Sequence, residues 1–406
     1  MNRLKLIILS ITMVSGLILP ISSGWAHGER SLEPFVRMRT IQWYDVAFSK
    51  SELSVNDELV ITGKFHVADD WPNNIPEPER VYLSLISPGP VFVRKERYIN
   101  GEPHLNSFPL EIGRNYEFKM VLKARIPGRY HAHPSFNVKD TGNIAGPGQW
   151  VEITGNADSF TNNITTLQGN TIDLETYGTA NGVRWHMFWM ALGVAWLVWW
   201  LRRPLFIPRY NMLLAGQEEE LVTKTDVSLA KGLLIGVPVI VLLGYVNATS
   251  QYEETIPLQT SIDLIDPLPL TAEYVSTKVK RAEYDVSDRK MTLTVDVTNN
   301  GDSAIRLGEL TTGSVRFINT DVVQDPGDYP EEYLAKNGLV VPAVNTIDPG
   351  ESATLTVIAQ DAAWEIEHLS SVIRDTDSRF GGLLFFFDED GNRYLSSVSS
   401  PIIPQF

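Results

Sequence analysis

Two histidines with a single residue between them are the strongest chemical feature of this sequence. They are His131 and His133, in the stretch GRYHAHPSFNV. If this stretch is a β-strand, residues two apart project from the same face, so the two imidazoles lie side by side. Neutral imidazole is a common ligand for copper and zinc. The spacing predicts a metal site, and an ordinary pair of surface histidines is the competing interpretation.

A third histidine becomes a ligand candidate if the chain is cut in front of it. Residues 1–26 have the pattern of a secretory signal peptide, with Arg3 and Lys5 before an apolar run and a cleavage point after Ala26. An uncleaved anchor helix is the alternative. Cleavage makes His27 the first residue, and its amine and ring can then chelate one metal. Three imidazoles and an amine favour Cu(II) over zinc.

Two more residues are candidates for supporting this site from outside the ligand set. Glu29 is close enough in sequence to His27 to act as a hydrogen-bond partner, although a solvated carboxylate is the alternative. His66 lies in the strand-like stretch GKFHVADDW. We expect it to lie in the same β-sandwich as His131 and His133.

Composition excludes several classes of function. The net charge is −15 and the pI about 5.0, which gives no support to nucleic-acid binding. No phosphate-binding glycine loop is present, so an NTPase or dinucleotide enzyme is not expected. The chain has no cysteine, which excludes a blue-copper electron carrier because that site requires a thiolate.

The elements that would position the histidines are short strands on either side of two apolar runs. Strand-like stretches separated by Pro, Gly and Asn fill residues 37–155 and recur after residue 270, which predicts two Greek-key sandwiches. The runs at 185–201 and 232–248 are each long enough to cross a bilayer as a helix. Five basic residues lie between the runs, so this loop is expected in the cytoplasm and both sandwiches on the opposite side.

The mature chain resembles the B subunits of the copper membrane monooxygenases, the family of particulate methane monooxygenase and ammonia monooxygenase. The matching stretches are HGERS (27–31), RMRTIQWYD (37–45), GKFHV (63–67), LKARIPGRYHAH (122–133), IAGPG (144–148), RRPLFIPR (202–209), DAAWEI (361–366) and SRFGGLLFFFD (378–388). The resemblance implies a mainly β protein, with two cupredoxin-like Greek-key β-sandwich domains joined by a two-helix transmembrane hairpin.

The resemblance and the residue patterns together give one expected domain order. It is a signal peptide at 1–26, an N-terminal periplasmic copper domain at 27–180, a transmembrane helix at 183–203, a cytoplasmic loop at 204–228, a second transmembrane helix at 229–248, a linker at 249–270, and a C-terminal periplasmic domain without metal ligands at 271–406.

The resemblance also implies a cofactor, partners and a location. The copper ligands that the family has in its B subunits match His27, His131 and His133. The implied partners are two polytopic membrane proteins, the A and C subunits, in a trimer of heterotrimers, together with membrane lipid, O2 and a small substrate, and no nucleic acid. The implied location is a bacterial inner or intracytoplasmic membrane.

One position departs from part of the family. Some methane-oxidising members have a histidine where this chain has Gln42, and that histidine forms a further copper site with the one matching His66. Because an amide is a poor copper ligand, we expect this further site to be missing and Gln42 to have at most a supporting role. The expected reaction is oxidation of ammonia to hydroxylamine. Methane or a short alkane is the alternative substrate, and a non-catalytic periplasmic copper-binding scaffold is the alternative of another class.

Overall fold

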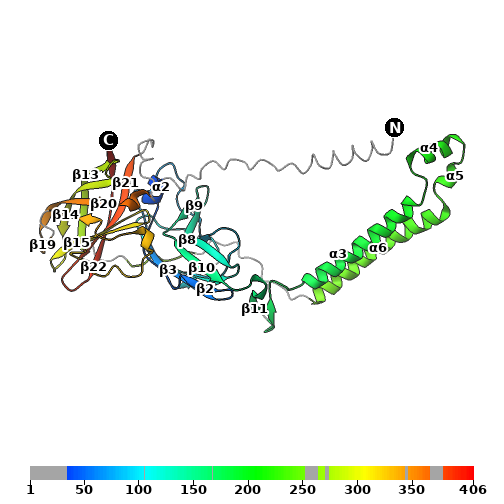
Figure 1. Cartoon of the computed structure of the whole chain (residues 1–406), viewed down its shortest axis with the longest axis horizontal. Helices are drawn as coiled ribbons and strands as arrows, with labels where there is room; N and C mark the ends of the chain where they lie inside the picture. Colours follow the sequence, from blue (N-terminus) through cyan, green and yellow to red (C-terminus); the bar gives the residue numbers. More distant parts are fainter. Residues whose placement is uncertain are drawn as a thin grey trace. The chain divides into compact units, whose positions relative to one another are not determined.

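The computed structural model describes residues 34–104, 106–166, 168–251, 264–269, 274–342, 346–365 and 378–406. The chain divides into two compact units, one formed by residues 1–158 and 260–406 and the other by residues 159–259. The first unit contains the large β-sheets and the second contains the long helices (Figure 1). The chain is mainly β, as predicted from the sequence, whereas the expected domain boundaries stay a prediction.

The N-terminal β region is a sandwich of two sheets. The first has the strand order β1 (Ile41–Phe48), β3 (Glu58–Val67), β7 (Asn115–Ala124), β5 (Phe92–Ile99) and β6 (Glu102–Pro103). The second has the order β2 (Glu52–Ser54), β10 (Gln149–Thr154), β8 (Gly128–Val138) and β4 (Val81–Ile86), with β9 (Gly142–Ala145) paired to β8. A six-residue helix, α2 (Pro34–Arg39), precedes β1.

Alternation of apolar and polar residues explains how these strands form a sandwich. The buried side chains of β7 include Tyr116, Phe118, Met120 and Leu122, while the neighbours Glu117 and Lys119 are exposed. Side chains two apart share a face, so this pattern turns one row of β7 toward the core. Fully buried aromatic rings in this core include those of Trp43, Phe65 and Phe136, whose centroids are 4.6–6.0 Å apart.

The C-terminal β region is one continuous run of paired strands. The order is β17 (Leu334–Ala335), β16 (Val315–Ile318), β15 (Ile305–Thr312), β21 (Arg379–Phe387), β22 (Arg393–Gln405), β13 (Val275–Asp285), β14 (Lys290–Asn299), β20 (Ser352–Gln360) and β18 (Leu339–Val340), with β19 (Thr346–Ile347) paired to β15. The long strand β22 pairs antiparallel with β21 through Pro401 and then parallel with β13 from Ile402, so it connects two halves of the run. Short 3-10 turns are η2 (Ala157–Ser159), η3 (Glu331–Tyr333) and η4 (Ala362–Glu365).

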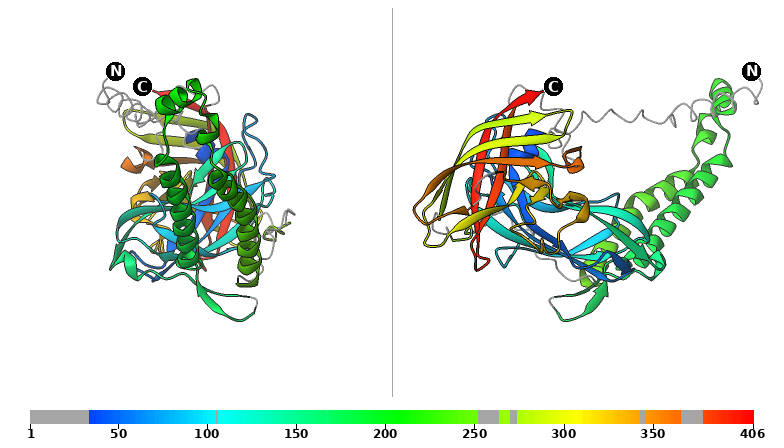
Figure 2. Two further views of the ribbon diagram at one scale, coloured as in Figure 1. Left: turned by 90° about the vertical axis from the view of Figure 1, so that its right-hand side faces the viewer. Right: turned by 60° about the vertical axis from the view of Figure 1, so that its left-hand side comes forward.

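The two β regions pack against each other within the first unit (Figure 2). Tyr44 on β1 packs on Leu383 and Phe385 of β21, with its ring centroid 5.6 Å from that of Phe385. The approach is close at Gly381, where an added Cβ would lie 2.6 Å from the carbonyl oxygen of Met38 on α2. A side chain at this position would push α2 away from β21.

The second unit is a helical hairpin preceded by a small strand pair. The pair is β11 (Asn163–Thr165) with β12 (Thr171–Asp173), and the helices are α3 (Thr179–Leu201), α4 (Phe206–Leu214), α5 (Glu218–Leu221) and α6 (Lys224–Gln251). The two long helices run side by side in both figures, and Asn181 near the start of α3 donates a hydrogen bond to Gln251 at the end of α6.

Length and composition bear on the predicted membrane spans. Helix α6 alone is long and apolar enough to cross a membrane, and α3 meets the same criterion when joined to α4, from which it is bent by 45°. These helices overlap the predicted spans at 183–203 and 229–248. The number of spans stays a prediction.

Candidate metal centre

Strand β8 places the two predicted ligands on the same face. His131 pairs with Trp150 of β10, and His133 pairs with Ile86 of β4. Ala132 between them is fully buried in the sandwich, so both imidazoles lie on the outer face of the sheet, where they are half-buried. The spacing of the two histidines on a strand therefore has the effect predicted from the sequence.

The two rings meet through one nitrogen each. His133 Nε2 lies 2.8 Å from His131 Nδ1, and the ring planes are nearly perpendicular at 87°. Metal–imidazole bonds are about 2.0 Å long, so two ligand nitrogens at right angles around one ion lie about 2.8 Å apart. The separation in the pair matches that of two ligands on one metal ion, and it is also the length of a direct hydrogen bond between the two rings.

The contact with Gly146 determines which ring nitrogen of His133 carries the proton. His133 Nδ1 lies 2.9 Å from the carbonyl oxygen of Gly146, and because a carbonyl only accepts, Nδ1 carries the proton. Burial lowers the pKa of His133 to about 4, so the ring is neutral at neutral pH. Nε2 of His133 therefore presents a lone pair toward His131.

Nε2 of His131, the ring nitrogen that does not contact His133, faces a carboxylate from the C-terminal β region. His131 Nε2 lies 3.2 Å from Glu332 Oε2, and this buried nitrogen has no aligned hydrogen bond. A neutral His131 has only one ring proton, which can satisfy either His133 or Glu332 but not both. A cation between the two rings removes this conflict, because His131 can then keep its proton on Nε2.

Small residues and an indole ring shape the surroundings of the pair. A Cβ added at Gly148 would lie 2.5 Å from Cε1 of His133, so only glycine leaves room for that imidazole. Trp150, which is 43% exposed, places its ring 4.9 Å from that of His131. On the same indole lies the guanidinium of Arg129, 4.8 Å from the ring centroid.

The two other predicted residues in the described part of the chain form a network of their own. Gln42 and His66 are direct partners in the pairing of β1 with β3, and both are buried. His66 contacts Asn115 through Nδ1 at 3.0 Å and Asp69 through Nε2 at 3.3 Å. Gln42 Nε2 donates to the carbonyl oxygen of Met38 at 2.7 Å. None of the contacts described for these two residues reaches His131 or His133.

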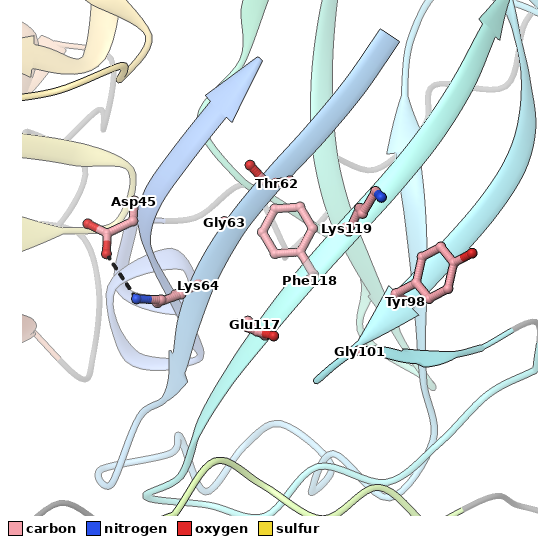
Figure 3. A pocket seen from close by; sticks show the side chains of 9 residues that line it. All are labelled: Asp45, Thr62, Gly63, Lys64, Tyr98, Gly101, Glu117, Phe118 and Lys119. Carbon is pink, nitrogen blue, oxygen red and sulfur yellow. Dashed lines mark ion pairs between the residues drawn. The ribbon is translucent and has the colours of Figure 1, made fainter. Parts of the chain in front are cut away.

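The remaining predicted residues, His27 and Glu29, lie outside the described residues. Within the described ranges no group of three His, Asp or Glu side chains is arranged to hold a metal ion. A hollow of about 550 Å³ on the other sheet lies beside Gly63 on β3 and Phe118 on β7 (Figure 3). Its lining includes neither histidine of the pair.

Comparison with known proteins identifies the family. The family model that describes the B subunits of monooxygenases matches residues 28–406. The chain belongs to this family. The monooxygenase B-subunit family therefore accounts for nearly the whole chain, including both β regions and the helical hairpin.

Individual relatives agree with the family. The chain is 48% identical over 385 residues to the particulate methane monooxygenase alpha subunit of Methylococcus capsulatus (strain ATCC 33009 / NCIMB 11132 / Bath), covering 95% of this chain and 93% of that one. The solved cupredoxin domain of amoB from Nitrosocaldus yellowstonii is 21% identical, with 29% of this chain and 88% of that domain covered and a TM-score of 0.24. The substrate type is not distinguished by these relatives.

Sequence reasoning missed the residues that hold the imidazoles in place. Gly146 and Gly148 belong to the stretch IAGPG, which marked the family resemblance but gave no contact with His133. Glu332 has no local signal at all, because an acidic pair before a tyrosine is ordinary on a protein surface. Only the packing of the two β regions brings Glu332 to His131.

Proposed function

We propose that this member of the monooxygenase B-subunit family holds copper as part of a membrane-bound, copper-dependent monooxygenase. The observation that carries this proposal is the 2.8 Å separation of His131 Nδ1 and His133 Nε2. Each ring has an acceptor near its other nitrogen, Gly146 O and Glu332 Oε2, as expected for imidazoles that ligate a metal. Nitrogen ligands without a thiolate suit copper.

His27 is proposed as the third ligand, through both its ring and the amine exposed by cleavage after Ala26. The described structure begins with α2, which carries Arg37. Burial is the main cause of the lowered pKa of His133, and the positive charge of Arg37 lowers it further, which places Arg37 near the pair. Arg37 lies ten positions after His27, and an extended chain over ten positions spans up to about 35 Å. The chain is therefore long enough for His27 to reach the pair, with Glu29 beside it.

The residues of this chain prepare the site for the metal. Gly146 orients His133, burial keeps that imidazole neutral, and Gly148 leaves the space it occupies. Bound copper would supply redox chemistry toward O2. Whether oxidation takes place at this metal depends on the assembled complex, so we assign this chain's residues the holding and orienting of the ligands.

The proposed reaction of the complex is the oxidation of ammonia. One oxygen atom of O2 enters ammonia to give hydroxylamine, and the other leaves as water with two protons and two electrons from a reductant. Gln42 favours this type, because no second histidine stands opposite His66. A second candidate, methane oxidation, is favoured by the 48% identity to the Methylococcus capsulatus methane enzyme.

The proposed assembly is a trimer of heterotrimers with two polytopic proteins, the A and C subunits. Helices α3 and α6 would cross a bacterial inner or intracytoplasmic membrane, with both β regions in the periplasm. Many apolar side chains of α6 are exposed, including Leu234, Ile235 and Leu243, which suits contact with lipid or with membrane helices. A non-catalytic copper scaffold with the same assembly is the alternative of another class.

Copper analysis of the purified complex tests this proposal. A His131→Ala/His133→Ala variant should lose one copper site relative to wild type, and an acetylated N-terminus at His27 should weaken binding while every ligand side chain is intact. Equal copper in wild type and the double variant would overturn the metal site. Turnover with ammonia against methane then decides the substrate, and a copper-loaded complex that oxidises neither would favour the scaffold.

A further inference from the structure

The C-terminal β region has no predicted metal ligand, yet one of its carboxylates lies at the histidine pair. Glu332 is part of η3, and its Oε2 is 3.2 Å from Nε2 of His131, the nitrogen that points away from His133. This contact joins residues of the two β regions within one compact unit. A carboxylate at the outer nitrogen of a ligand imidazole fixes both its tautomer and its orientation.

Neighbouring side chains hold η3 in place. Tyr329 and Tyr333, before and after Glu332, are 7% and 4% exposed. Tyr329 donates a hydrogen bond to the carbonyl oxygen of Ser314, and the hydroxyl of Ser314 accepts one from Arg37 on α2. The backbone of Glu332 is therefore anchored to both β regions, although its side chain is 48% exposed.

The neighbouring acid does not share this position. Glu331 is 92% exposed, and its described contact is a surface ion pair with Lys336 at 3.9 Å. Two adjacent carboxylates on one short turn thus have different surroundings. One faces a ligand imidazole and the other faces solvent, which supplies a matched control.

We propose that Glu332 is a positioning residue for the copper site, and this inference rests on the proposed copper-binding function. Its carboxylate selects the tautomer of His131 that carries the proton on Nε2. Nδ1 of His131 then has a lone pair and lies 2.8 Å from Nε2 of His133, which also has one, so both nitrogens can bind the same ion. Without that carboxylate, the proton of His131 is free to move to Nδ1 and bond to His133, which closes the site to a metal.

Charge gives the same carboxylate a second effect. A negative group next to a ligand imidazole strengthens the ligand as a donor and stabilises Cu(II) relative to Cu(I). Glu332 should therefore favour the oxidised metal. Its removal should weaken Cu(II) binding more than Cu(I) binding and raise the reduction potential of the site.

Competition with a chelator and the Cu(II) electron paramagnetic resonance spectrum test this role in the purified complex. Glu332→Gln should bind Cu(II) at this site about 10- to 100-fold more weakly and change its spectrum, as is usual when a supporting partner of a metal ligand is lost. Glu332→Asp should restore part of the affinity, and Glu331→Gln should behave as wild type.

The outcomes separate this inference from the function on which it rests. If His131→Ala/His133→Ala removes the copper while Glu332→Gln leaves its affinity and spectrum unchanged, the positioning role is overturned and the copper site stands. If the double variant keeps all its copper, both are overturned. An equal loss in Glu331→Gln and Glu332→Gln would also overturn the specific role of Glu332.

Discussion

The histidine pair depends on a glycine that is not itself a ligand. A Cβ at Gly148 would lie 2.5 Å from Cε1 and 2.6 Å from Nδ1 of His133. We predict that Gly148→Ala turns this imidazole away from His131 and lowers copper affinity at least tenfold, while the fold is retained. Copper titration of the purified complex measures the effect.

Gly182→Ala is the matched control, since nothing lies within 4 Å of a Cβ added there. It adds the same methyl group at a half-buried position of α3. Full copper affinity in Gly148→Ala would mean that His133 can shift without loss of the site. That result would contradict the geometry derived for the pair.

The buried His66 supports a prediction about pH. Its hydrogen bond to Asp69 lowers the pKa of that carboxyl below its usual value of 3.8. A carboxyl with a lowered pKa stabilises the fold above the pKa of the unfolded chain, and this contribution is lost as pH falls through the folded pKa. Asp69→Asn should lower the melting temperature by up to about 3 °C at pH 6, because the side chain is partly exposed.

The difference between Asp69→Asn and wild type should shrink below about pH 3.8, where the wild-type carboxyl also becomes neutral. Thermal unfolding at several pH values measures it. Exposed Asp57→Asn serves to report the general effect of removing one negative charge. A difference for Asp69→Asn that stays constant from pH 6 to pH 3 would refute the assignment.

At the level of residues, the sequence predicted that the two histidines lie on one face of a strand, but not which residues surround them. His131 and His133 share a face because side chains alternate along a strand, which holds for any strand. Their partners Gly146 and Glu332 are brought in by a loop and by the second β region, whose positions no local pattern encodes. The family resemblance associated the positions of Gln42 and His66 with one metal site, and in the structure these two residues lie directly opposite each other on β1 and β3.

The helical hairpin is held at its loop end by one buried carboxylate. Asp226, 2% exposed, accepts hydrogen bonds from Trp199 Nε1 and Arg203 Nη2 on its Oδ1, and from the backbone N–H and hydroxyl of Thr223 on its Oδ2. The Thr-x-x-Asp spacing caps the start of α6. The same residue thus begins one long helix and joins it to the other.

Replacing Asp226 by alanine should loosen this end of the hairpin. The change leaves four donors without their acceptor, and we expect the hairpin to become less stable. Faster proteolysis within residues 202–223 of the membrane-embedded complex would report it. The control variant Glu219→Ala, changed at an exposed position of α5, should be cleaved at the wild-type rate. Equal cleavage rates for the two variants would contradict the role of Asp226.

At the level of elements, periodicity and apolar runs predicted strands and the two long helices well. Helix α6 begins at Lys224, next to the Thr223–Asp226 network, and contains the predicted span at 229–248, whose limits stay a prediction. Helices α4 and α5 fall in the stretch predicted only as a loop. Their short lengths give too little periodicity to recognise.

The two β regions are joined by a buried charge network. Glu309, 1% exposed, binds Arg316 through both carboxylate oxygens at 2.7 and 3.0 Å. Arg393 contacts Glu309 at 2.6 Å and also pairs with Asp45 of the N-terminal β region. One carboxylate thus compensates two guanidinium groups where the two β regions meet.

Neutralising this carboxylate should weaken the whole first unit. Glu309→Gln leaves Arg316 without its carboxylate and leaves Arg393 with Asp45 alone. Breaking a buried pair in this way costs about 3–5 kcal/mol. Calorimetry should show a lower unfolding temperature than for Asp288→Asn, which removes an exposed ion pair with Lys290. Equal unfolding temperatures would show that the network adds nothing to the packing of the two regions.

At the level of the whole molecule, the sequence predicted two β regions and a hairpin but not how the β regions meet. Their contact depends on residues far apart in sequence, such as Tyr44 with Phe385 and Gly381 with Met38. Local periodicity gives the buried face of a strand and says nothing about which distant face covers it. The contact of Glu332 with His131 follows from that packing and was therefore beyond prediction.

Pulsed electron paramagnetic resonance on the assembled complex, with 15N placed in histidine, tests the copper site most directly. The spectrum of wild type minus that of His131→Ala/His133→Ala isolates the copper held by this chain. We predict a Cu(II) signal with couplings to three imidazoles and one amine nitrogen. A difference spectrum without histidine couplings, or no difference at all, would contradict copper binding by the pair.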